Sequence, residues 1–251
     1  MTPWEAVAIF VAGIGAGGIN AVVGSGSLIT FPTMVALGMP PVVANVSNTV
    51  GLVPGSLTGA FGYRVELRGQ LRRLVRLGIP AVVGAVAGGV LLLYLPPETF
   101  DIVVPILIGV ACVLVVIQPR LNKWLGARRE HPHPHGGPWL LAGVFACGIY
   151  GGYFGAAQGV LLIGLMGTLL DDGLQRLNAA KNVLALLVNA AAALLFIAIA
   201  EVDWLAALMV ALGAAIGGFF GAKIGRRLPA PVLRWLIVCI GIVAIVKLVY
   251  G

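Results

Sequence analysis

Charged residues are scarce in this chain. Only 10% of its 251 residues are charged, whereas 60% are hydrophobic. A typical soluble domain carries about 25% charged residues, so this composition excludes an ordinary soluble protein. Apolar runs recur from end to end, which predicts an all-α, polytopic membrane protein surrounded by the lipid bilayer. The N-terminal stretch MTPWEAVAIF has no basic segment, so we expect its apolar run to belong to the mature protein rather than to a cleaved signal.

Other absences narrow the function. No acidic residue lies deep inside an apolar run, so a proton relay through membrane carboxylates lacks its usual parts. No P-loop is present, which argues against an ATP-driven pump, and we expect no cofactor. Cys112, Cys147 and Cys239 lie singly in apolar runs, which favours neither a disulfide framework nor a metal site. The spaced imidazoles of 131–135 suit a transition metal, but a solvated linker is the favoured interpretation.

Two kinds of apolar region alternate along the chain. Segments of spanning length, about 20 residues each, occur at 43–61, 78–95, 102–118, 178–200, 205–225 and 232–250. The regions 4–38 and 139–170 differ, because breaks at 24–27 and 155–159 are each followed by an arm of only a dozen residues. Such an arm covers about half of the hydrocarbon layer. We therefore expect two re-entrant helical hairpins that enter the membrane and turn back.

The chain also repeats itself. With a shift of 133 residues, 80–97 aligns with 213–230, and both segments end in Leu-Pro. Small residues four apart also occur on ordinary helix-packing faces, but the agreement of several segments at nearly one shift favours a duplication. We expect a first transmembrane repeat at 1–118, a basic cytoplasmic linker at 119–138 and a second repeat at 139–251. Each repeat would contain one hairpin and three spanning helices.

The distribution of positive charge predicts the relative orientation of the repeats. Thirteen of the sixteen Lys and Arg residues lie in 64–76, 120–129 and 223–234, which the positive-inside rule places in the cytoplasm. The loop 201–203 carries only acids, yet it corresponds to the basic loop 64–76 in the repeat. This exchange of charge favours inverted over parallel halves. The net charge of +7 resides in such loops, so it indicates membrane orientation rather than a nucleic-acid partner.

Polar residues gather at the hairpin breaks. In a bilayer, irregular backbone is tolerated only where protein or a watery cavity covers it. A helix N-terminus carries roughly half a positive charge, and its free N–H groups suit an anion. We expect Ser25, Gly26 and Ser27 to begin the short helix 28–38, and the residues Gly155, Ala156, Ala157 and Gln158 to begin the short helix 159–170. The alternative is that these small residues only allow close helix packing.

A second polar element is ANVSNT at 44–49, which corresponds to NAAKN at 178–182. Lys181 is the one basic residue well inside a long apolar span, which is costly unless the lysine faces a cavity or reaches the interface. We interpret it as the anchor of an anion, with snorkelling to the interface as the alternative. The predicted substrate site comprises Asn20, Gly24, Ser25, Gly26, Ser27, Asn45, Ser47, Asn48, Thr49, Gln158, Asn178, Lys181 and Asn182.

The block AGGINAVVGSGSLITFPTMVALGMPPVVANVSNTVGLVPGSLTG, the terminators LPPETF and RRLPAPVLRW, and the duplicated layout resemble the TauE/SafE family of sulfite exporters. The resemblance covers nearly the whole chain. It implies a bacterial inner-membrane carrier for small sulfur-containing anions. The family's glycine-rich break corresponds to 24–27 and its polar element to Ala44, Asn45, Ser47, Asn48 and Thr49. The second half departs from the family pattern, with GAAQG at its break and NAAKN as its polar element.

Together these features predict a secondary transporter for a small anion, bound near the midplane between the repeats. A sulfur oxyanion or organosulfonate is the favoured substrate, and Lys181 or the substrate itself would carry any coupled proton. An anion channel is one alternative. A membrane-embedded accessory subunit or enzyme is another, although no nucleophile–base pair is visible. We expect a multi-pass protein of the bacterial inner membrane, and no enzyme.

Overall fold

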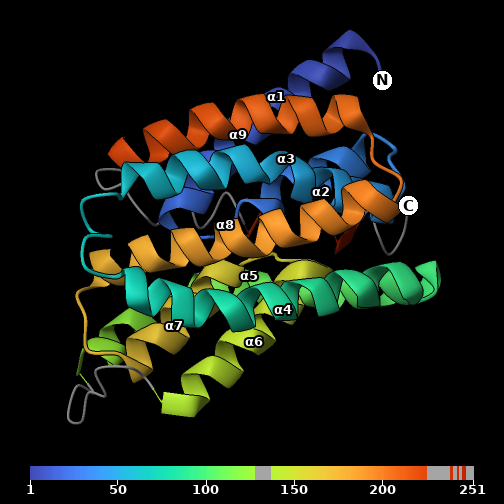
Figure 1. Cartoon of the computed structure of the whole chain (residues 1–251). Coiled ribbons are helices and arrows are strands. Elements are labelled where there is room, and N and C mark those ends of the chain that lie inside the picture. The colour runs from blue at the N-terminus through green and yellow to red at the C-terminus, as the bar shows by residue number, and fades with distance from the viewer. Residues whose placement is uncertain (128–136, 225–237, 240–241, 243–244, 247–251) are drawn as a thin grey trace.

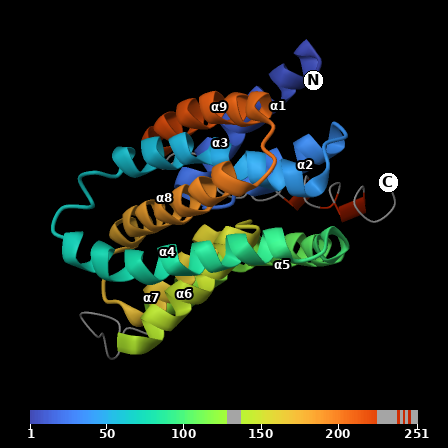
Figure 2. The same cartoon turned by 45° about the vertical axis from the view of Figure 1, so that its right-hand side comes forward.

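A computed structural model describes residues 1–127, 137–224, 238, 239, 242, 245 and 246. Within these residues the chain is helical and contains no strand, which confirms the predicted all-α class. The helices lie side by side in a bundle, with α1, α3 and α9 on one side, α4, α6 and α7 on the other, and α8 between them (Figures 1 and 2). The histidines of 131–135 lie outside the described residues, and so does most of the predicted span 232–250.

The first half contains α1 (Pro3–Val22), α2 (Ser27–Ala36), α3 (Pro41–Gly62), α4 (Leu71–Tyr94) and α5 (Pro97–Ala127). The second half contains α6 (Gly137–Tyr153), α7 (Gln158–Leu169), α8 (Leu174–Ile199) and α9 (Trp204–Ile224). Five helices are long and apolar enough to cross a membrane, namely α1, α4, α5, α8 and α9. The chain is therefore a polytopic membrane protein, as predicted. α3 also has 22 residues, but its polar stretch lowers its hydropathy.

Two helix boundaries differ from the sequence prediction. α4 begins at Leu71 rather than near 78, because its first turns consist of Leu and Arg, which are good helix formers. α5 continues to Ala127, so the first part of the predicted linker 119–138 is helical. Periodic helix-forming residues thus extend both helices beyond the apolar core that hydropathy detects.

Both predicted hairpins are interrupted where the sequence indicated. α1 ends at Val22 and α2 begins at Ser27, while α6 ends at Tyr153 and α7 begins at Gln158. The chain turns back at the first break, since Gly26 lies against Ala16 and Ile29 against Gly15. The short arms have 10 and 12 residues, which is about half of a membrane crossing.

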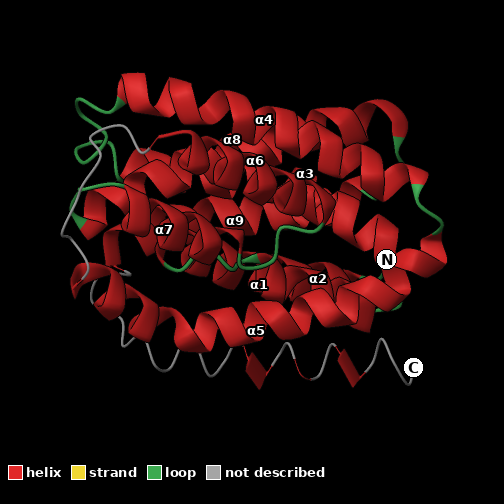
Figure 3. Cartoon of the chain, turned by 90° about the horizontal axis from the view of Figure 1, so that it is seen from below, coloured by secondary structure: helices red, strands yellow, loops and turns green. Residues whose placement is uncertain are grey.

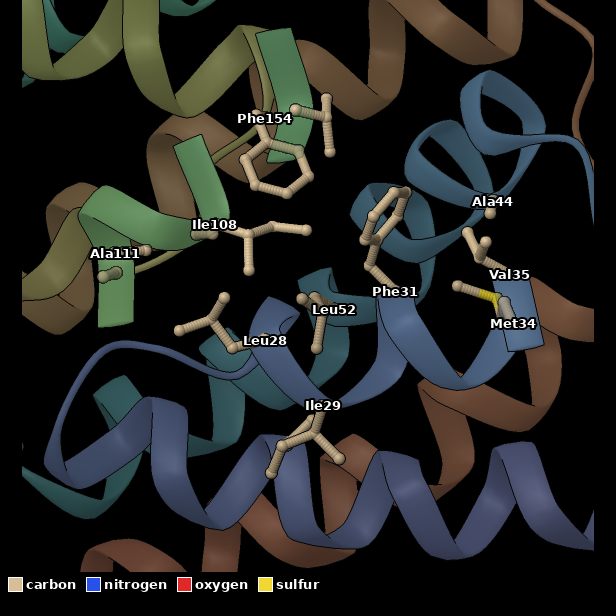
Figure 4. Packing of buried hydrophobic residues seen from close by; sticks show 14 of the residues in the cluster. Leu28, Ile29, Phe31, Met34, Val35, Ala44, Leu52, Ile108, Ala111 and Phe154 are labelled. Atoms are coloured by element: carbon tan, nitrogen blue, oxygen red, sulfur yellow. The ribbon is translucent and has the colours of Figure 1, made fainter. Parts of the chain in front are cut away.

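The buried core surrounds α2. Leu28, Phe31 and Met34 are completely buried, and Figure 4 shows the Phe31 ring pointing towards Phe154 at the end of α6. The two ring centroids lie 5.1 Å apart in an edge-to-face arrangement. Ile29 points the other way, towards α1 (Figure 4). α2 is therefore fixed on several sides by apolar packing, which positions its N-terminal turn.

The predicted halves interlock through glycine contacts. α1 packs along α9, and α4 packs along α6. A Cβ atom added to Gly17 would collide with the Ala214 backbone, and one added to Gly88 would collide with the Ile149 backbone. These helices approach one another closely because their contact faces lack side chains. The first helix of each half is thus held by the fourth helix of the other.

α3 and α8 run antiparallel. Ser47, near the start of α3, contacts Asp203 just beyond the end of α8, whereas Ser56 accepts a hydrogen bond from Asn189 in the middle of α8. Ser56 and Asn189 are 133 residues apart, which equals the shift found in the sequence. A two-fold axis between equivalent helices brings equivalent positions together in this way. The inverted repeat and the domain boundaries stay predictions, and this antiparallel pairing favours the inversion.

An ionic cluster joins the start of α4 to the connection between α7 and α8. Arg73 Nη1 lies 2.5 Å from Asp172 Oδ2, and Arg176 Nε lies 2.9 Å from Asp172 Oδ1. The Gln70 side chain donates a hydrogen bond to the Arg176 carbonyl, and the Arg176 guanidinium donates one to the Arg68 carbonyl. Seen from the direction of Figure 3, these connections lie at one end of the bundle. The basic loop of the first half is thus tied to the second half.

The inverted topology predicts the labelling of two equivalent loops. In a chain whose native cysteines are replaced by alanine, Arg68→Cys should be shielded from a membrane-impermeant thiol reagent in intact cells. Glu201→Cys should be labelled under the same conditions. The two residues lie in the loops α3–α4 and α8–α9, which parallel repeats would place on the same side. Equal labelling at both positions would therefore contradict the inversion.

The ionic cluster predicts a pH-dependent stability. Burial alone would raise the pKa of the Asp172 carboxyl, but hydrogen bonds from Arg73, the Gly173 amide and Arg176 hold it below its ordinary value. A lowered pKa stabilises the fold above the unfolded-state pKa, and this contribution disappears as pH falls through the folded-state value. Asp172→Asn should lower the free energy of unfolding at pH 7 by about 1 kcal/mol.

Thermal unfolding in detergent between neutral pH and pH 3 checks this. The difference between wild type and Asp172→Asn should shrink once pH falls below about 4. Asp171→Asn is the matched control, because Asp171 is exposed and forms no ion pair with any described residue. A difference that grows towards acid would contradict the assignment.

Candidate functional site

The two hairpin breaks meet backbone to backbone. The amide of Gly159 in α7 donates a hydrogen bond of 3.1 Å to the carbonyl oxygen of Gly24. Gly24 has φ = 85°, and a Cβ atom there would lie 2.5 Å from Gly159 Cα. Only glycine satisfies both this left-handed conformation and this close approach. The breaks of the two halves, far apart in sequence, therefore form one local structure.

The N-terminal turn of α2 gathers hydroxyl and amide groups. Asn48 of α3 donates to Ser27 Oγ at 3.3 Å and accepts a hydrogen bond from Thr30 Oγ1. Ser25 is 1% exposed, and its Oγ atom has no hydrogen-bond partner. Among the described residues, none accepts a hydrogen bond from the amides of Ser25, Gly26 or Ser27. Leaving a buried hydroxyl and the neighbouring amides without hydrogen-bond partners costs free energy, unless a bound ligand accepts their hydrogen bonds.

The N-terminus of α7 differs only in part: among the described residues the amides of Ala156 and Ala157 also lack acceptors, but the next three amides have them. Gln158 donates to the Gly155 carbonyl, Gly159 to Gly24 and Val160 to Ala157. The Gln158 side chain folds back and donates to the Cys147 carbonyl of α6 at 3.1 Å. Gln158 therefore points away from the first hairpin. The two short helices were expected to contribute alike, and both leave amides unpaired among the described residues, but only the turn of α2 adds a buried hydroxyl without a partner.

Lys181 is completely buried, two turns into α8. Its amino group donates to the Asn20 carbonyl at 2.9 Å and to the Ala21 carbonyl at 3.3 Å. Asn178 and Asn182 also donate to Ala21. These carbonyls belong to the last turn of α1, where a helix leaves acceptors unpaired and where a cation is favourable. The lysine thus caps a broken helix, and its burial does not fit snorkelling to the interface.

The stem of Lys181 crosses the second break. A Cβ atom on Gly159 would lie 2.8 Å from Lys181 Cδ. The residue therefore contacts both breaks at once, with its stem on Gly159 and its amino group on the end of α1. The anchoring role predicted from the sequence stays a prediction, and the structure adds these protein partners to it.

Asn45 performs the equivalent task in the other half. Its side-chain amide donates to the Tyr153 carbonyl at the end of α6 at 2.9 Å. Asn45 and Asn178 are separated by the repeat shift, and each caps the first arm of the opposite hairpin. The remaining Oδ1 atoms of both asparagines are buried without a partner. The two polar elements therefore hold the breaks crosswise.

Other residues of the predicted site lie elsewhere. Ser47 Oγ accepts a hydrogen bond from the Asp203 amide near the start of α9, so it does not lie with Lys181. Thr49 donates to the carbonyl of Asn45 in its own helix. The Asn20 side chain donates to Ser56 at 3.4 Å. Ser47 and Thr49 thus stabilise helix ends and helix pairs, whereas Asn20 borders the turn of α2, since a Cβ atom on Gly26 would lie 3.0 Å from its Cβ.

Gly26 is positioned by α1. A Cβ atom there would lie 2.6 Å from the Ala16 carbonyl oxygen, so a larger residue would displace the hairpin itself. Its Cα therefore faces protein, and an anion would reach only its amide. A substitution at Gly26 would therefore disturb the folded hairpin, so its effect on transport would not report on ligand contact alone.

Three polar residues were missed by the predicted site. Thr30 and Ser56 lie in the apolar parts of α2 and α3, and Asn189 lies in the middle of α8. Ser56 links Asn20 to Asn189 by hydrogen bonds. The shared shift of 133 between Ser56 and Asn189 was a signal, because both are isolated polar residues within long apolar helices.

Comparisons with known proteins agree with this architecture. Residues 9–248 match the family model described as "Sulfite exporter TauE/SafE". The chain is 28% identical over 249 residues to "Probable membrane transporter protein YfcA" of Escherichia coli K12, covering 97% of this chain and 89% of that protein. It is 25% identical over 245 residues to a "Probable membrane transporter protein" of Haemophilus influenzae, covering 96% and 93% respectively. No solved structure matches the chain.

The contacts of Lys181 predict the result of its removal. Lys181→Met should lower the free energy of unfolding by about 2 kcal/mol without added anion, because two buried carbonyls lose a charged donor. Unfolding in detergent measures the effect. Lys223→Met is the matched control, because that lysine is exposed in the last turn of α9. Unchanged stability in Lys181→Met would contradict the capping role.

Proposed function

The chain belongs to the TauE/SafE sulfite exporter family of membrane transporters, and from this premise we propose that it is a secondary carrier for a small sulfur oxyanion or organosulfonate. Its helical spans and bacterial relatives make it a multi-pass protein of the bacterial inner membrane. The family is one of transporters and not of enzymes. The substrate and its binding site are the parts that we propose.

The observation that carries the proposal is the unpaired N-terminal turn of α2. The amides of Ser25, Gly26 and Ser27 and the buried Ser25 hydroxyl form a set of donors without protein acceptors among the described residues. A helix N-terminus adds a partial positive charge at the same place. Broken helices in transporters direct such N-termini at anionic groups of their substrates. We assign the anion to this turn, with Asn48 and Thr30 beside it.

Lys181 contributes positive charge to the same site from its position between the end of α1 and Gly159. Its amino group lies on the last turn of α1 and its stem on Gly159, so its charge is next to the junction of the two breaks. In a low-dielectric interior this charge acts over a longer distance than in water. No Asp or Glu forms a hydrogen bond or an ion pair with Lys181 in the described part of the chain. The lysine therefore both holds the break and raises the local potential for an anion.

Burial of the site favours a carrier over an anion channel. Ser25, Thr30 and Asn48 are each 1% exposed, and Ser27 is 9% exposed. An anion can reach these groups only when the hairpins separate from their neighbours. Such a movement is the alternating access of a carrier. Proton coupling would use Lys181 or the anion itself, since both change charge on protonation.

A ligand screen on the purified full-length protein tests the proposal. Sulfite, sulfate, thiosulfate, sulfoacetate and taurine should be compared with a carboxylate by their shift of the melting temperature. We expect one of the sulfur anions to stabilise the protein. Ser25→Ala should weaken its affinity about 10- to 100-fold, because a hydrogen bond to a charged group contributes about 1.5–3 kcal/mol.

Ser47→Ala is the control for this experiment. It removes a hydroxyl of the same type, but one that binds the Asp203 amide away from the turn of α2. Its ligand affinity should equal that of the wild type even if its stability falls. Equal affinity in Ser25→Ala and wild type would place the anion elsewhere. Saturable flux with counterflow in liposomes would separate a carrier from a channel.

A further inference from the structure

An apolar groove lies between α4 and α8 on the outside of the bundle. Its volume is about 510 Å³. It is lined chiefly by Leu71, Val75, Ile79 and Val83 of α4 and by Val183 and Leu187 of α8. The two helices lie next to one another in Figures 1 and 2. Gly78 in the floor of the groove faces the Leu187 side chain, so the absence of a larger residue keeps the groove deep.

Two arginines continue the rim of this groove. Arg72, Arg76, Ile79 and Val83 follow one another at helical spacings of three or four residues, so they share one stripe of α4. Arg72 and Arg76 are exposed, and within the described residues neither has a carboxylate partner. Arg73 is different, because it is engaged by Asp172. The groove therefore ends in two available guanidinium groups.

The position of the arginines selects the occupant. They belong to the loop and helix start that the positive-inside rule places at the cytoplasmic surface, where anionic lipids produce a negative potential. A guanidinium group binds a phosphate through two parallel hydrogen bonds. An apolar groove in the hydrocarbon layer accommodates an acyl chain, while the phosphate remains at the surface.

We propose that this groove is a binding site for an anionic glycerophospholipid of the inner leaflet. One acyl chain lies between α4 and α8, and the headgroup phosphate is held by Arg72 and Arg76. The lipid thereby joins two helices that belong to different predicted halves. The site is separate from the turn of α2, so this inference stands or falls independently of the proposed anion substrate.

Native mass spectrometry of the full-length protein in detergent tests the site. Phosphatidylglycerol and phosphatidylcholine with the same acyl chains are added separately, and the lipid-bound fraction is measured. The wild type should retain phosphatidylglycerol in preference. Arg72→Ala/Arg76→Ala should weaken phosphatidylglycerol binding about 30-fold and leave phosphatidylcholine unchanged, because each arginine contributes roughly fivefold. Both residues are exposed, so the variant should melt at the wild-type temperature.

Two further variants make the test specific. Arg120→Ala/Lys223→Ala removes the same charge from exposed positions on α5 and α9 and should bind like the wild type. Val75→Trp fills the groove, keeps every arginine and should weaken both lipids. An equal loss in the two charge variants, or no preference for phosphatidylglycerol, would overturn the proposal. A change of oligomeric state in Val75→Trp with unchanged lipid binding would also overturn it, and would identify the groove as a contact between copies.

Discussion

The structure depends on satisfying broken backbone inside an apolar bundle. When α1 ends at Val22, its last carbonyls are left without intrahelical donor partners, and lipid offers no donors to them. The amino group of Lys181 and the amides of Asn178 and Asn182 supply those donors. A lysine is costly in this environment, but helix-terminal carbonyls compensate its charge, because a helix C-terminus carries a partial negative charge. The break and the lysine therefore require one another.

The same problem is solved more simply in the second half. α6 also ends at a break, and there the side chain of Asn45 alone donates to the Tyr153 carbonyl. The amides at the start of α7 are satisfied by protein, including the carbonyl of Gly24. The first break therefore supplies a carbonyl that accepts a hydrogen bond from the second break. Among the described residues, no carbonyl of the second break accepts one from the first. The unpartnered Ser25 hydroxyl has no counterpart at the second break, which supports the turn of α2 as the proposed place for an external acceptor.

Much of the fold could be predicted from the sequence, because hydropathy and helix-breaking residues act locally. The positions of both breaks follow from glycine, and four of the five long apolar helices, α4, α5, α8 and α9, follow from apolar length. The site was predicted only in part. Which residues are polar is visible in the sequence, but Ser47 and Asn48 differ by one position and point to different helices. In the sequence Gln158 has the position of a ligand donor, but in the structure its side chain donates to the Cys147 carbonyl. Partners of this kind depend on tertiary packing between segments that lie from 11 to 156 residues apart in the chain.

The distribution of close and polar contacts also indicates where the bundle can move. α1, α3 and α9 are joined by glycine faces such as Gly17 and Gly55, whose backbones touch the Ala214 region. α4 and α6 are joined in the same way through Gly84 and Gly88. Contacts of this type tolerate little sliding, because backbone packs directly on backbone. Each of these two units combines helices of both predicted repeats.

The interface between the units is of another kind. Between the units, α8 and the junction of the two breaks contribute the hydrogen bonds of Ser56 with Asn189, Lys181 with α1 and Asn45 with α6, beside the apolar packing of Phe31 on Phe154. A hydrogen bond between a side chain and a carbonyl can exchange one partner for another at a small net cost in free energy. Separating two interlocked backbones costs more. A carrier of this design would therefore open along the polar interface, and the turn of α2 lies on it. In the proposed carrier, the groups that satisfy the broken helices would thus also rearrange when an anion binds.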